Sequence, residues 1–115
     1  MINRVILIGN LGKDPEIKTT PSGKKVANFS LATTRTVKGE KSTSWHNLVA
    51  WEKTAEIVEK WLKKGSKVFV EGRIEYRTWD KGDGTKGYMT DIVVESLQML
   101  DKKEQDSQPE APANW

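Results

Sequence analysis

Alternating and clustered apolar positions predict strands through most of the first hundred residues. Residues 3–12 hold the run Val-Ile-Leu-Ile at 5–8, bounded by glycines at 9 and 12, which is typical of a buried strand. Later segments alternate apolar and polar side chains between turn-forming residues. We expect further strands at residues 26–34, 45–51, 67–79 and 88–100. The polar segments 37–44 and 80–87 are expected to be loops, the second of them closing a hairpin.

One segment changes from strand to helix periodicity. Residues 54–64 carry an apolar stripe at helical spacing, with Thr54 as a plausible N-cap and Gly65 placed to end the helix. The stripe consists of Ala55, Val58 and Leu62 with Ile57 and Trp61. We therefore expect Trp61 to pack in the core.

The order of these elements is three strands, a helix and two strands. This order is that of the OB-fold, an all-β, five-stranded Greek-key barrel with a helix between strands three and four, which binds oligonucleotides or oligosaccharides. Residues 1–100 would form this single domain, and the polar residues 101–115 with two prolines would form a flexible, mildly acidic tail.

Charge and composition narrow the partners. Residues 1–100 hold 17 Lys and Arg against 12 Asp and Glu, whereas residues 101–115 hold 2 against 4. A basic body favours an anionic partner, nucleic acid before membrane. There is no cysteine, no signal peptide and no segment of membrane-spanning length, so we expect a cytoplasmic, nucleoid-associated protein. No metal site, cofactor or catalytic constellation is recognisable, which argues against an enzyme.

Five tryptophans in 115 residues are the most informative feature of the composition. In residues 67–79 the even positions from Val68 to Tyr76 form an apolar face, which leaves Trp79 on the solvent face with Arg73 and Arg77. Trp45 and Trp51 are six residues apart and also share a face. Aromatic rings among positive charges stack unpaired bases at roughly 1–3 kcal/mol each, so the predicted ligand is single-stranded. Trp115 has no assigned role.

The segments NRVILIGNLGKDPE (3–16), KKVANFSLAT (24–33), WHNLVAWEKTAE (45–56), WLKKGSKVFVEGRI (61–74) and YRTW (76–79) resemble the bacterial single-stranded DNA-binding protein family. The similarity extends from residue 2 to residue 100. It implies an OB-fold that assembles as a homotetramer and coats single-stranded DNA in DNA replication, DNA repair and DNA recombination.

The resemblance also assigns individual residues. Trp45, Trp51 and Trp79 match the base-stacking aromatics, and His46 matches a histidine near a subunit interface. A further aromatic of the family is replaced here by Val37. Four positions match basic residues of the family, and Arg35 and Arg73 are added from their setting. The expected phosphate-binding set is Lys18, Arg35, Lys53, Lys64, Arg73 and Arg77.

The tail departs from the family pattern. Members usually end in a long linker and an acidic tip with a terminal phenylalanine that recruits replication and repair proteins, whereas this chain ends in QPEAPANW. Recruitment of such partners through the tail is therefore doubtful. An alternative function is that of an accessory primosomal OB-fold replication protein, and a third is a nuclease on an OB scaffold.

Overall fold

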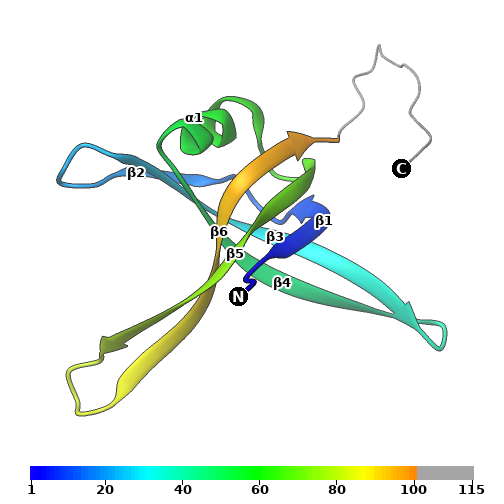
Figure 1. The fold of residues 1–115 in the computed structure, drawn as a ribbon. Helices are drawn as coiled ribbons and strands as arrows, with labels where there is room; N and C mark the ends of the chain where they lie inside the picture. The colour runs from blue at the N-terminus through cyan, green and yellow to red at the C-terminus, as the bar shows by residue number, and fades with distance from the viewer. Residues whose placement is uncertain (101–115) are drawn as a thin grey trace.

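The computed structural model describes residues 1–100, which form one sheet of six strands and one helix (Figure 1). The elements in chain order are β1 (Val5–Leu11), β2 (Glu16–Thr19), β3 (Lys25–Val37), β4 (Glu40–Trp51), α1 (Glu52–Trp61), β5 (Lys67–Asp80) and β6 (Lys86–Met99). The expectations for the tail, including Trp115, lie outside the described residues. Within residues 1–100, no helix is long and apolar enough to cross a bilayer.

Five of the strands close into a barrel. Their order is β1-β5-β6-β4-β3, and β1 returns to β3 through the pairs Asn10–Ala32 and Leu11–Leu31. Gly9 makes this closure possible, because a Cβ there would lie 2.2 Å from the carbonyl oxygen of Ala32. With α1 between the third and fourth barrel strands, the predicted OB-fold is confirmed. The short strand β2, which pairs with β3 outside this ring, was not predicted.

The core is formed by side chains that alternate inward along the barrel strands. Leu31 and Leu48 are buried from β3 and β4, as are Val68 and Val70 from β5. Ala55, Val58 and Leu62 complete the same cluster from α1, which covers one end of the barrel (Figure 1). The helix begins at Glu52 directly after the extended Trp51, two residues before the predicted N-cap.

The prediction that Trp61 packs in the core is wrong. Its side chain is 55% exposed, and the Lys60 ammonium lies 5.7 Å from the ring centroid. Positions 55, 58 and 62 alone define the buried stripe, and each residue turns the helix by about 100°. Ile57 and Trp61 therefore lie at the edge of the stripe and face solvent.

Besides the short β2–β3 hairpin, two long hairpins extend beyond the barrel as arms, β3–β4 and β5–β6 (Figure 1). The segment 37–44 is not a loop: β3 runs to Val37 and β4 starts at Glu40, with only Lys38 and Gly39 between them, both at positive φ. The β5–β6 hairpin forms the second arm, where both sheet faces meet solvent. For this reason Tyr76 is exposed, although its parity predicted a core position. The predicted alternation holds only up to Ile74, where the barrel ends.

Candidate nucleic-acid interface

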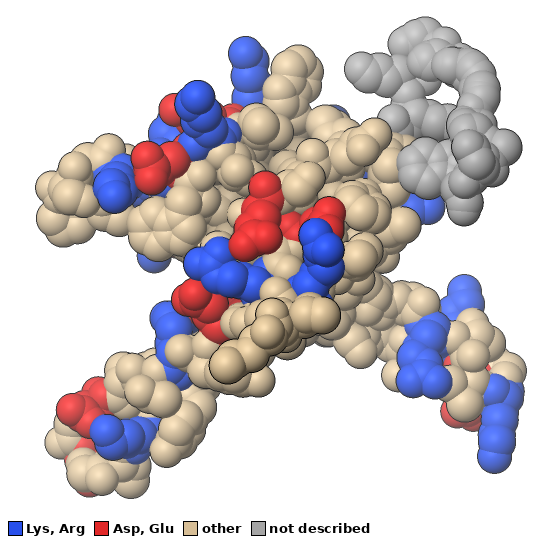
Figure 2. Space-filling view, in the orientation of Figure 1, with Lys and Arg blue, Asp and Glu red and all other residues tan. Residues whose placement is uncertain are grey.

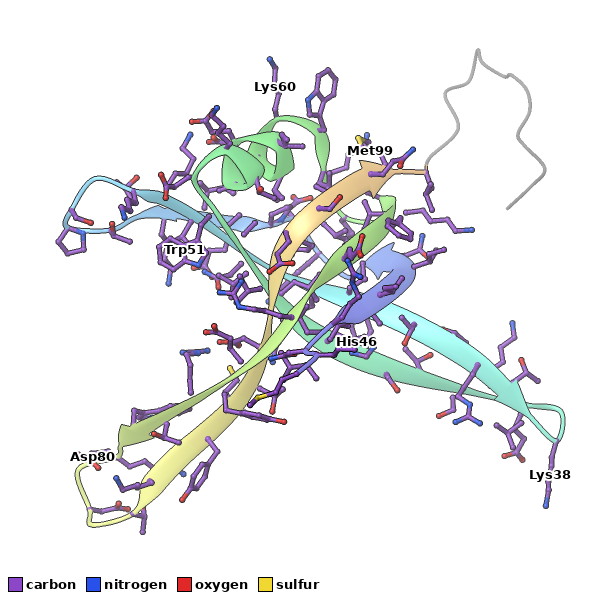
Figure 3. All side chains as sticks on the ribbon, viewed as in Figure 1. Lys38, His46, Trp51, Lys60, Asp80 and Met99 are labelled. Atoms are coloured by element: carbon purple, nitrogen blue, oxygen red, sulfur yellow. The ribbon has the colours of Figure 1, made fainter. Side chains whose placement is uncertain are left out.

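The outward side chains of β4 form a row that begins and ends with tryptophan. Leu48 and Ala50 point into the core, so Trp45, Val49 and Trp51 point outward. Trp45 is 61% exposed and Trp51 is 42% exposed. Their predicted exposure is therefore confirmed. Trp51 lies near the end of β4 that leads into α1 (Figure 3).

The outer face continues from β4 to Trp79. Val49 pairs with Val93 on β6, and Val93 pairs with Arg73 on β5. The register from Arg73 to Trp79 contains no bulge, so Trp79 lies on the same sheet face. It is 44% exposed, as the parity predicted. All three tryptophans thus belong to one continuous surface, here called the outer face, formed by β3, β4, β6 and β5.

Glycines support two of these rings. A Cβ added to Gly12 would come within 2.4 Å of the Trp45 ring, and one added to Gly87 would come equally close to Trp79. Each indole therefore packs directly against main chain while part of it stays exposed. A ring held in this way loses little conformational entropy when a planar ligand stacks on it.

A groove lies on the outer face. Polar residues of β3 and β4 line it, and charged residues border it. The polar residues are Asn28, Ser30 and Asn47, and the bordering residues are Lys13, Asp14, Glu16, Arg77 and Asp91, together with Met89. The amide and hydroxyl groups can hydrogen-bond to the edges of any base. The arrangement suits an extended, unstructured polymer with planar groups.

Three of the expected phosphate-binding residues are exposed lysines. Lys18 lies on β2, Lys53 lies at the start of α1, and Lys64 follows α1. Lys18 pairs with Val26, which in turn pairs with Trp51. Lys18 therefore lies on the same face of the sheet as Trp51. It is 3.7 Å from the Glu16 carboxylate. Lys53 is the second residue of α1. Lys64 follows the helix, and its backbone N–H donates to Asp14 Oδ1 at 2.8 Å.

Arg35 does not lie with Trp45. On the β3–β4 arm it pairs with Ser42, whereas Trp45 pairs with Ala32, and alternate residues face opposite sides. Lys41, paired with Thr36, is on the Trp45 side instead. The sequence did not single out Lys41, because the segment around it was expected to be a loop. Lys and Arg are prominent at the end of this arm (Figure 2).

The two arginines of β5 in the expected phosphate-binding set are held by carboxylates. Arg73 donates to Glu95 at 3.0 Å and to Glu75 at 3.1 Å, and these bonds raise the pKa of its guanidinium. Arg77 donates to Asp91, which likewise raises the pKa of Arg77. Both cations remain charged, but each is partly neutralised. Asp91 lies fourteen positions from Arg77 in the chain, so no local pattern indicated this contact.

His46 lies on the inward side of β4 and is half-buried. Its Nε2 lies 2.9 Å from the hydroxyl of Thr33. Among residues 1–100, no group of three or more His, Asp or Glu side chains could hold a metal ion.

The fold and its outer face define a class: an OB-fold barrel with exposed tryptophans and basic side chains along one continuous surface. The model of the Single-strand binding protein family matches residues 2–100. The chain belongs to this family.

Individual relatives agree with this membership. Single-stranded DNA-binding protein 1 of Chlorobaculum tepidum is 46% identical over 109 residues, covering 90% of this chain and 67% of that protein. The single-stranded DNA-binding protein of Halalkalibacterium halodurans is 43% identical over 111 residues, covering 94% and 66%. The chain thus spans about two thirds of the length of these relatives. A solved structure described as "Plasmodium falciparum SSB complex with ssDNA" matches with a TM-score of 0.81 at 32% identity, covering 88% of this chain and 96% of that one.

Proposed function

We propose that this protein binds and coats single-stranded DNA without sequence preference, and so protects it during replication, repair and recombination. Bases stack on Trp45, Trp51 and Trp79, and lysines and arginines neutralise the phosphates. The observation that carries the proposal is the continuous outer face, on which three exposed indoles share one sheet surface. A duplex keeps its bases inside the stack, so these rings serve an unpaired strand.

The cationic set divides into two groups. Lys18, Lys53 and Lys64 are exposed, and their contacts with phosphates would release counterions from the DNA. Arg73 and Arg77 are anchored by carboxylates and contribute fixed donors, and Arg77 lies beside Trp79. Lys41 on the Trp45 side of the β3–β4 arm and Arg35 on its opposite side add further cations.

Assembly into a homotetramer is part of the proposal. Ile6 and Ile8 are exposed on the outer side of β1, and Ile8 pairs with the half-buried Phe69 of β5. An apolar surface of this kind is suited to contact with another copy of the chain. It lies on strands other than those that carry Trp45 and Trp51, so association there leaves these two rings accessible.

Neither alternative has a supporting observation. The curated relatives are named as single-stranded DNA-binding proteins, and nothing distinguishes the outer face as that of a primosomal accessory protein. Nor do the names of these relatives give support to a nuclease on an OB scaffold.

Equilibrium binding to oligo(dT) and to a duplex of equal length tests the proposal. Loss of three stacking contacts at about 1–3 kcal/mol each should make the duplex bind at least about 100-fold more weakly. Affinity for oligo(dT) should also fall steeply as salt rises, because phosphate contacts release counterions. Equal affinity for the two DNA forms at the same salt concentration would contradict the proposed function.

A further inference from the structure

Asp91 is a buried carboxylate on a surface that is proposed to meet a polyanion. It is 5% exposed, and it borders the groove of the outer face from β6. Burying a carboxylate is costly unless it is paired, and its negative charge repels phosphate. An acidic group in this place therefore needs a compensating role.

The role follows from its contacts. Arg77 directs Nε to one Asp91 oxygen and Nη2 to the other, the second at 3.4 Å. Nη2 also lies 2.8 Å from the Met89 sulfur. A two-point contact to a carboxylate fixes the plane of a guanidinium, which a single contact does not. Asp91 and Met89 thus hold the Arg77 head group in one orientation.

The fixed guanidinium lies beside a stacking ring. The central carbon of the Arg77 head group is 5.9 Å from the Trp79 ring centroid, a cation–π distance. Gly87 supports the same indole through its bare backbone. A connected chain of contacts therefore runs from Asp91 through Arg77 and Trp79 to Gly87.

We propose that Asp91 is a positioning residue for single-stranded DNA: it sets the Arg77 guanidinium beside Trp79, so that a base stacks on the ring while Nη1 of Arg77 meets the adjoining phosphate. The contacts with Asp91 and Met89 use Nε and Nη2, and Nη1 carries two further N–H groups. The inference rests on the proposed function, because its ligand is the same DNA.

The neighbouring Glu75 provides a matched control. It pairs with Asp91 in the β5–β6 register and lies on the same sheet face, but it is exposed and binds Arg73, which keeps a second carboxylate partner, Glu95 at 3.0 Å, when Glu75 is replaced. Glu75→Gln and Asp91→Asn each remove one negative charge from nearly the same place. Electrostatics alone predicts that both variants bind DNA more tightly, whereas a positioning role for Asp91 predicts opposite signs.

The experiment measures oligo(dT) affinity for the full chain and the two variants at one salt concentration. Glu75→Gln should bind as tightly as the unmodified protein or more tightly. Asp91→Asn should bind about two- to tenfold more weakly, because Arg77 must then be ordered at the moment of binding. Asp91→Asn binding as tightly as Glu75→Gln would overturn the inference.

A double-mutant cycle separates positioning from a general loss of structure. In an Arg77→Ala background, Asp91→Asn should cause no further loss of affinity, because the group that it positions is already gone. A loss in that background equal to the loss in the unmodified protein would also overturn the inference. If neither the unmodified protein nor Glu75→Gln prefers oligo(dT) to duplex, the proposed function itself fails.

Discussion

Replacing both Trp51 and Trp79 with alanine is expected to weaken oligo(dT) binding by at least about 30-fold. Each ring contributes roughly 1–3 kcal/mol by stacking, and the two lie on different strands without a contact through which their effects would be coupled. Both side chains are more than 40% exposed, so their removal leaves the core unchanged. Titration of the variant with oligo(dT) measures the loss, and circular dichroism checks the fold.

Trp61→Ala is the control for this prediction. Trp61 is 55% exposed, like the proposed stacking residues, but it lies on α1 and not on one of the strands that form the outer face. Its removal should leave the affinity unchanged. An equal loss of oligo(dT) affinity in the Trp61 variant and in the double variant would mean that any exposed tryptophan contributes to binding. That result would contradict base stacking on the outer face.

Gly9→Ala is expected to destabilise the barrel by about 3 kcal/mol. The new Cβ would lie 2.2 Å from the Ala32 carbonyl oxygen, where β1 closes on β3. Neither strand can move without breaking barrel hydrogen bonds, so the cost falls at the upper end of the usual range for overpacking. Chemical denaturation, followed by circular dichroism, measures the free energy of unfolding.

The matched control for Gly9→Ala is Gly12→Ala, three residues further along the chain. Here the new Cβ meets the Trp45 ring rather than main chain, at 2.4 Å. A side-chain rotation relieves this contact, so Gly12→Ala should keep nearly full stability and change only the environment of Trp45. Equal destabilisation by the two substitutions would contradict closure of the barrel through Gly9.

The order of elements was predictable because the barrel strands bury one face each and alternate accordingly. Prediction failed where that cause is missing. β2 has one half-buried apolar residue, Ile17, and lies between turn signals, so nothing marked it as a strand. The β3–β4 arm is polar on both faces, and its strands exist because they pair with each other, as in the hydroxyl contact of Thr34 with Thr43.

The candidate site was predicted to the extent that it depends on parity along one strand. Trp79 and Arg77 share a face because no bulge separates them, and this could be inferred locally. Whether Arg35 shares a sheet face with Trp45 could not be predicted, because that relation depends on the register between two strands. The contact between Arg77 and Asp91 depends on the pairing of β5 with β6, which the sequence does not specify. Trp61 was assigned to the core because the apolar stripe of α1 is wider than the part of it that the barrel buries. The sequence does not indicate which residues at the margin of the stripe stay exposed.

Tryptophan fluorescence during titration with oligo(dT) tests most directly whether bases stack on the outer face. Stacking should quench the unmodified protein strongly. A variant with Trp45→Phe, Trp51→Phe and Trp79→Phe should still bind, since phenylalanine also stacks, but its remaining tryptophans, Trp61 and Trp115, should be quenched little. Two results would contradict the stacking of bases on the outer face. One is quenching of that variant to the same extent as the unmodified protein. The other is quenching of the unmodified protein by duplex DNA to the same extent as by oligo(dT).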